Sequence, residues 1–171
     1  MQRFLTYTGI FVVLVLLQVF LLDNLALSVY FHPLIYVAFV IVLPMDMRQV
    51  WVLLLATLMG LVMDLLTGQA GLNVMATAAV GFFRPTIVGL VCGRGSGFDD
   101  SVPSLHRFTH KNLMAYIFAV VLIHSTLFFV LESLSLMHIL HTVIRVVVSS
   151  TTAFVIVWYL VKIIVERIFK N

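Results

Sequence analysis

Charged residues are scarce in this 171-residue sequence, since Asp, Glu, Lys and Arg together make up only 10% of it. Soluble domains carry roughly 25% charged residues, so there are too few here to cover a folded surface in water. Hydrophobic residues make up 63% of the chain, which favours a lipid environment. The composition therefore predicts an integral membrane protein and excludes an ordinary soluble domain.

Cysteine and net charge are also in short supply. Cys92 is the only cysteine, which excludes an intramolecular disulfide and a metal site built from several cysteines. The formal net charge of +3 is too small and too dispersed to indicate nucleic-acid binding. We therefore expect neither a nucleic-acid partner nor a cofactor.

Long apolar runs separated by short polar turns account for most of the chain. A helix of roughly 20 residues crosses a bilayer, and six such runs predict a single all-α transmembrane domain over residues 1–171. The first run is expected to be a retained helix, because no small-residue signal cleavage site follows it. Pro33 should start or kink the second helix, since proline lacks a backbone donor. The expected spans are residues 4–22, 25–43, 50–66, 72–91, 113–131 and 139–163, with a cytoplasmic loop over residues 92–112.

Lysine and arginine gather on one side of the expected spans. Basic turns mark the cytoplasmic side, whereas the turns on the other side hold Asp23 and Glu132 and no basic residue. Both termini are therefore predicted to be cytoplasmic. The basic residues concerned are Arg3, Arg48, Arg94, Arg107, Lys111, Lys162, Arg167 and Lys170. Aromatic residues towards the span ends fit interfacial belts; they are Tyr7, Tyr30, Tyr36, Tyr116, Trp51 and Trp158.

Three charged residues, Asp64, Arg84 and Arg145, interrupt the apolar runs, where a charge is costly and needs a partner or water. Asp64 and Arg145 lie at similar depths below the same end of their spans, so Arg145 is the expected cationic neighbour of Asp64. Arg84 precedes Pro85, which frees the carbonyl of Gly81. Arg84 is expected either to donate to carbonyls there or to extend to cytoplasmic headgroups.

The other polar clusters give weak signals for chemistry. His138 and His141 lie near Glu132, but a metal site would need further ligands, so we interpret them as interfacial histidines. The hydroxyl run of residues 149–152 has no paired base and is expected to bond to carbonyls of its own helix or to neighbouring helices. The glycine-rich stretch of residues 93–97 lacks the preceding strand and following Lys-Ser/Thr of a phosphate loop.

Several short motifs in roughly the first 90 residues occur in a recognisable order. They are Gln18–Leu25 closing the first span, Pro33–Val37 leading to Leu43–Pro44, Gly60–Gly68, Gly71–Asn73 and Phe83–Pro85. The Gly60–Gly68 stretch is the strongest of them, because glycine allows close helix approach four residues before a charge that the membrane penalises. In this order and spacing the motifs resemble the rod shape-determining protein MreD family. The second half of the chain matches that family only in hydropathy and length.

The resemblance implies a non-enzymatic scaffold in the bacterial inner membrane that belongs to the cell-wall elongation complex. It implies a fold similar to that of the substrate-binding subunits of energy-coupling-factor transporters. The implied partners are an MreC-like protein with one transmembrane helix and, through it, the actin-like MreB and the peptidoglycan synthases; membrane lipids are also expected. Candidate structural or partner-binding residues are Asp23, Pro33, Tyr36, Pro44, Gly60, Asp64, Gly68, Gly71, Asn73, Arg84, Pro85 and Arg145.

Two other functions stay open from the residues alone. A vitamin-binding transporter subunit would need a pocket near the outer face, lined by Asp64, Asn73, Glu132, His138, His141 and Arg145. The Ala-x-x-x-Ala pattern expected for its cytoplasmic grooves is absent near the start of the first span. An intramembrane enzyme would have to depend on Glu132 with the two histidines, and we rank it last.

Overall fold

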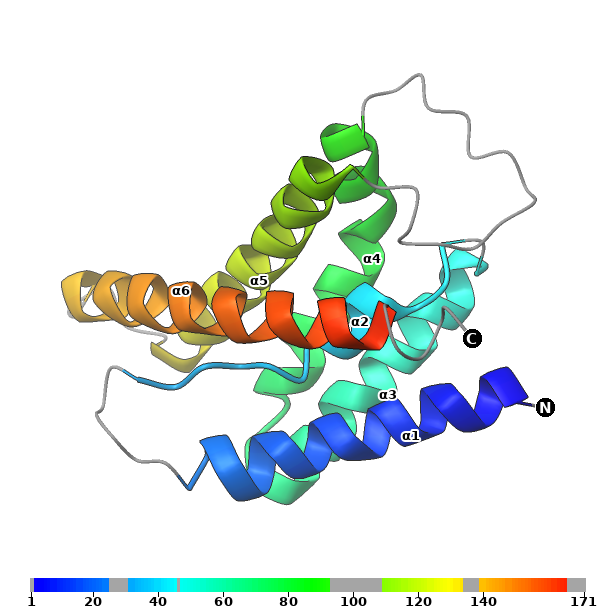
Figure 1. Cartoon of the computed structure of the whole chain (residues 1–171). Helices are drawn as coiled ribbons and strands as arrows, with labels where there is room; N and C mark the ends of the chain where they lie inside the picture. Colours follow the sequence, from blue (N-terminus) through cyan, green and yellow to red (C-terminus); the bar gives the residue numbers. More distant parts are fainter. Residues whose placement is uncertain (1, 25–30, 46, 93–108, 134–138, 166–171) are drawn as a thin grey trace.

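The computed structural model describes residues 2–24, 31–45, 47–92, 109–133 and 139–165, and the regular structure within these ranges is helical (Figure 1). Within these ranges, five helical stretches are long and apolar enough to cross a membrane. They are α1 (Gln2–Leu16) continued by the π-helix η1 (Leu17–Leu22), α3 (Gln49–Thr67), α4 (Leu72–Cys92), α5 (His110–Ser133) and α6 (Ile139–Ile163). The chain is therefore a multi-pass, all-α membrane protein, as the composition predicts.

The predicted transmembrane helix over residues 25–43 is wrong in its described part. Residues 31–35 have no regular structure, and the only α-helix between Phe31 and Leu43 is α2 (Ala38–Val42), with five residues. Residues 25–30 lie outside the described ranges. Pro33 therefore belongs to a non-helical stretch and does not kink a helix. We call residues 31–43 the central segment.

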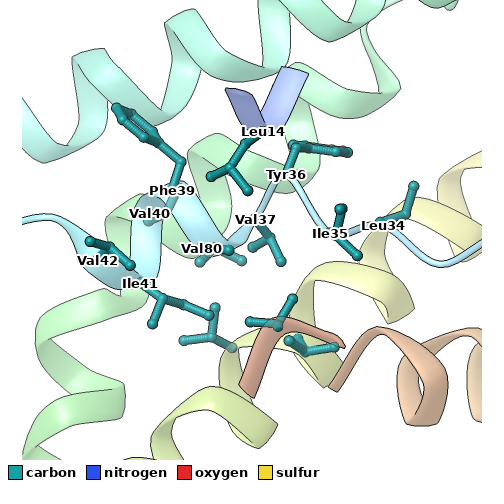
Figure 2. Packing of buried hydrophobic residues seen from close by; sticks show 14 of the residues in the cluster. Leu14, Leu34, Ile35, Tyr36, Val37, Phe39, Val40, Ile41, Val42 and Val80 are labelled. Carbon is teal, nitrogen blue, oxygen red and sulfur yellow. The ribbon is translucent and has the colours of Figure 1, made fainter. Parts of the chain in front are cut away.

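The central segment runs through the middle of the bundle, and this position explains its backbone. Every side chain from Leu34 to Leu43 is at most 3% exposed, and α2 contacts α1, α3, α4 and α6. Figure 2 shows the side chains of this segment directed to several sides, among the surrounding helices. Non-helical backbone is tolerated at membrane depth only where protein buries it, and here the other helices enclose it.

The long helices surround this segment in chain order. α3 packs on α4, α4 on α5 and α5 on α6, while α1 and α6 flank the central segment (Figure 1). The turn between α3 and α4 contains Gly68 at φ 69° and Gly71 at φ 90°, a backbone conformation that glycine adopts without steric cost. The beginning of α1 and the end of α6 lie on the same side of the bundle (Figure 1), the arrangement expected for both termini.

Gly60 allows the closest approach between α3 and α4. A Cβ atom at this position would lie 2.6 Å from the carbonyl oxygen of Asn73 and 2.7 Å from the Cα of Val74, and it would also meet the Thr77 hydroxyl. Two of these three neighbours are backbone atoms of α4, which cannot rotate away. The expectation that Gly60 permits close helix packing is confirmed.

Gly60→Ala should therefore destabilise the protein by about 1–3 kcal/mol, the usual cost of overpacking a core. Gly9→Ala in α1 is the matched control, because a Cβ there meets nothing within 4 Å. The control should be neutral or slightly stabilising, since alanine favours helix more than glycine does. Thermal midpoints of the two variants in the same detergent test this, and equal midpoints would contradict the close approach.

Candidate functional site

Gln18 binds the first part of the central segment at the end of α1. Its side chain is fully buried; the amide oxygen accepts the N–H of Ile35 at 2.8 Å, and the amide nitrogen donates to the carbonyl of Pro33 at 3.2 Å. The same nitrogen donates to Asp23 Oδ1 at 2.7 Å. One neutral side chain thus pairs two backbone groups that the extended segment cannot pair within itself.

The π-helical turn η1 places this glutamine. The N–H of Asp23 donates to the carbonyl of Gln18 at 2.9 Å, five residues earlier in the chain, which is the π-type pattern. From the opposite flank, Ser149 Oγ of α6 accepts the N–H of His32 at 3.2 Å. The π-helix η1 and helix α6 therefore each supply one polar side chain to the same stretch of backbone.

Tyr36 connects the central segment to α4 and α5 by hydrogen bonds. Its hydroxyl donates to Asn73 Oδ1 at 2.5 Å and lies 3.1 Å from His124 Nε2, and all three side chains are buried. The Tyr36 and His124 rings also meet edge to face. The interpretation of Tyr36 as an interfacial aromatic is therefore wrong, because its side chain is fully buried and its hydroxyl is bound inside the bundle.

Asp64 caps the first turn of α4 and is only 6% exposed. Its carboxylate accepts the N–H groups of Asn73 and Val74 at 3.1 and 2.9 Å and the side-chain amide of Asn73 at 2.9 Å. A carboxylate at a helix N-terminus is stabilised by unpaired N–H groups and by the helix dipole. The N-terminus of α4 therefore stabilises the buried carboxylate of Asp64, a role that was expected of Arg145.

The predicted pairing of Asp64 with Arg145 is wrong. Arg145 pairs with Glu132 of α5 at 3.0 Å, and its guanidinium lies 4.8 Å from the centre of the Phe129 ring. The sequence positions of Asp64 and Arg145 predict similar depths along their helices. They do not predict the direction in which each side chain points, and hence which residue it contacts. Arg145 thus belongs to the α5–α6 contact, away from the central segment.

Arg84 binds the other end of the central segment. It is 4% exposed, and its guanidinium donates to the carbonyls of Leu43 and Pro44, the latter at 3.1 Å, and to the Tyr116 hydroxyl at 3.0 Å. Leu43 is the C-cap of α2, so the cation lies at the negative end of that helix. Tyr116 is fully buried, which also corrects its assignment to an interfacial belt.

The expectation that Arg84 donates to the carbonyl of Gly81 is wrong, and its buried guanidinium donates to groups within the bundle. Pro85 lies inside α4 and frees the Gly81 carbonyl as predicted, but Gln49 is its partner. Gln49 Nε2 donates to the carbonyls of Gly81 and Phe82, both at 2.9 Å. A polar side chain from α3 thus compensates for the missing hydrogen bond of the proline.

The structure brings most of the predicted residues to one framework around the central segment and leaves a few outside it. Asp23, Pro33, Tyr36, Pro44, Asp64, Asn73 and Arg84 form its hydrogen bonds, while Gly60, Gly68 and Gly71 shape the α3–α4 pair that carries Asp64 and Asn73. Pro85 is exposed, and Arg145 lies elsewhere. Gln18 was predicted only as part of a motif and Ser149 only as part of the hydroxyl run. Gln49 and His124 were not predicted to take part, although a glutamine or histidine within an apolar run is a usable signal.

The residues proposed to line a small-molecule pocket form two separate groups. Asp64 and Asn73 bond to each other at the α3–α4 junction, whereas Glu132 and Arg145 pair between α5 and α6; His138 lies outside the described ranges. The hydroxyls of Ser150, Thr151 and Thr152 donate to carbonyls of their own helix, as expected.

Comparison with protein-family models, curated proteins and solved structures finds no match to this chain. The geometry of the site indicates a structural role, in which buried polar side chains stabilise the non-helical backbone of the central segment.

Replacing Gln18 with leucine should destabilise the protein. The change leaves the N–H of Ile35 and the carbonyl of Pro33 buried without partners, at a cost of about 1–3 kcal/mol for each group. Thr151→Val is the matched control, because that hydroxyl is exposed and bonds to its own helix at Val147. Thermal denaturation in detergent should show a large loss for Gln18→Leu and almost none for the control; two equal losses would contradict the role of Gln18.

Arg84→Lys should also be destabilising, because a single ammonium cannot reach the three oxygens that the guanidinium fork spans. Hydrogen bonds to charged groups contribute about 1.5–3 kcal/mol, and at least one of these should be lost. Arg145→Lys is the control, since that ion pair is partly exposed, with side chains 24% and 34% accessible, and should change stability by less than about 1 kcal/mol. If thermal midpoints show the control to be the more damaging change, Arg84 does not anchor the segment.

Proposed function

We propose that the protein is a non-enzymatic inner-membrane scaffold of the bacterial cell-wall elongation complex, which binds an MreC-like partner with one transmembrane helix. The observation that carries this proposal is where the motif residues lie. The motifs that resemble the MreD family are separated in the sequence, yet their polar residues meet at the two ends and the middle of the central segment.

This convergence supports the resemblance, because the motifs are far apart in the sequence and nothing in their order requires their residues to share one internal structure. Gln18 and Asp23 come from the first motif, Pro33 and Tyr36 from the second, and Arg84 from the last, and each takes part in the framework. Unrelated matches would be expected to scatter over turns and lipid-facing positions. If the chain shares its fold with the MreD family, the motif residues are expected to build one internal structure.

A scaffold role also fits the division between the interior and the surface. The buried polar groups are mostly bonded to one another or to backbone, whereas the outer face of α3 is a row of exposed leucines that includes Leu54, Leu58 and Leu61. Helices in lipid recognise each other by van der Waals packing and a few polar contacts. A partner that presents a single transmembrane helix is suited to such apolar faces.

Copurification from the native membrane tests the proposal. The tagged chain, extracted in mild detergent and analysed by native mass spectrometry, should retain a single-span protein with a periplasmic domain, together with wall-synthesis enzymes. A stoichiometric vitamin-sized ligand or copurifying ATPase subunits would instead indicate a transporter component.

The variants Gly60→Ala and Gly9→Ala test whether the packing of α3 on α4 is needed for cell shape and partner binding. Depletion of the protein should make rod-shaped cells round, and Gly9→Ala should restore the rod shape. Gly60→Ala should restore it less well and should retain less partner per molecule in the membrane, because the α3–α4 contact is disturbed. A protein whose loss leaves cell shape unchanged would not be an elongation scaffold.

A further inference from the structure

Exposed basic side chains gather at one end of the bundle. This is the end where α3 and α5 begin and α6 finishes, and its exposed basic residues include Arg48, Lys111 and Lys162. Among the described residues, the acidic side chains Asp23, Asp64 and Glu132 all lie towards the opposite end. No carboxylate within the described ranges pairs with these three cations.

Two of the cations each lie one helical turn from a tryptophan, and the chain has only two tryptophans. Arg48 precedes the first turn of α3, with Trp51 three residues later and 58% exposed. In the last turns of α6, Lys162 Nζ lies 5.7 Å from the centre of the Trp158 ring, and the adjacent Tyr159 is 60% exposed. The two pairs occupy the same end of different helices.

Such a pair matches the two chemical layers of a phospholipid. An indole ring favours the boundary between headgroup and acyl chain, while a lysine or arginine one turn nearer to water can reach the phosphate. Zwitterionic lipids would gain much less, since their own cation opposes the protein's.

We propose that Arg48 with Trp51, and Lys162 with Trp158, form two binding sites for anionic phospholipids, such as phosphatidylglycerol, in the leaflet at the basic end. The sites select lipids by headgroup charge, with the tryptophan holding the glycerol region and the cation binding the phosphate. This inference does not depend on the proposed scaffold function.

The tryptophans themselves report on the sites. We would reconstitute a Trp158→Phe protein, in which only Trp51 fluoresces, and a Trp51→Phe protein, in which only Trp158 fluoresces, into phosphatidylcholine vesicles. Brominated phosphatidylglycerol or brominated phosphatidylcholine would then be added at equal mole fraction, since bromine quenches tryptophan on contact. Stronger quenching by the anionic lipid is expected at both positions.

Charge substitutions then assign the selectivity to individual residues. Lys162→Gln should lower the preference for the anionic lipid at Trp158 roughly fivefold, the effect of one basic residue near an anionic surface, and should leave the preference at Trp51 unchanged. Arg48→Gln should give the reverse pattern. Lys162→Arg and Arg48→Lys keep the charge and should keep the preference.

Three outcomes would overturn the proposal. Equal quenching by the two brominated lipids would make both pairs general interfacial anchors without headgroup selection. If millimolar inorganic phosphate abolished the stronger quenching by brominated phosphatidylglycerol, the cations would bind free phosphate and would not recognise the lipid. Loss of selectivity at both tryptophans after either single charge substitution would indicate a general surface potential and contradict two separate sites.

Discussion

The rest of the structure depends on one constraint, which is that backbone polar groups need partners where no water is present. The central segment passes through the bundle with an extended stretch that cannot form the regular bonds of a helix. An unpaired peptide group in an apolar surrounding costs several kcal/mol, so each anchor has to come from another element. Gln18, Ser149 and Arg84 supply bonds from three different helices, and the segment in turn fills the space between them.

The same requirement explains how two charges are kept inside the bundle without pairing. Asp64 lies at the N-terminus of α4 and Arg84 at the C-terminus of α2, where the ends of helices present unpaired N–H and carbonyl groups of the complementary polarity. Each charge thereby satisfies backbone groups that would otherwise be orphaned. A direct Asp–Arg pair would have left both helix ends uncapped. In the observed arrangement, each buried charge is stabilised and also pairs the backbone groups at a helix end.

The long helices could be predicted from the sequence, because a run of about 20 apolar residues has few alternatives in lipid. The central segment could not, because a continuous apolar run carries no periodicity that separates helix from buried extended chain. The partners of Asp64 and Arg84 were missed for a related reason. Depth along a helix can be counted from the sequence, but the direction that a side chain faces depends on how the helices rotate and pack. The freed carbonyl at Gly81 was correctly predicted, whereas its donor, Gln49, lies 32 residues earlier on a helix that only the fold brings close.

The backbone conformation of residues 31–43 can be measured without altering the chain. Solid-state NMR of the isotope-labelled protein in lipid bilayers gives carbon chemical shifts that report backbone conformation residue by residue. We expect extended-type shifts for residues 31–35 and helical shifts for Ala38–Val42. Helical shifts continuing from Phe31 to Leu43 would show an ordinary transmembrane helix, and the framework of Gln18, Tyr36 and Arg84 described here would then be wrong.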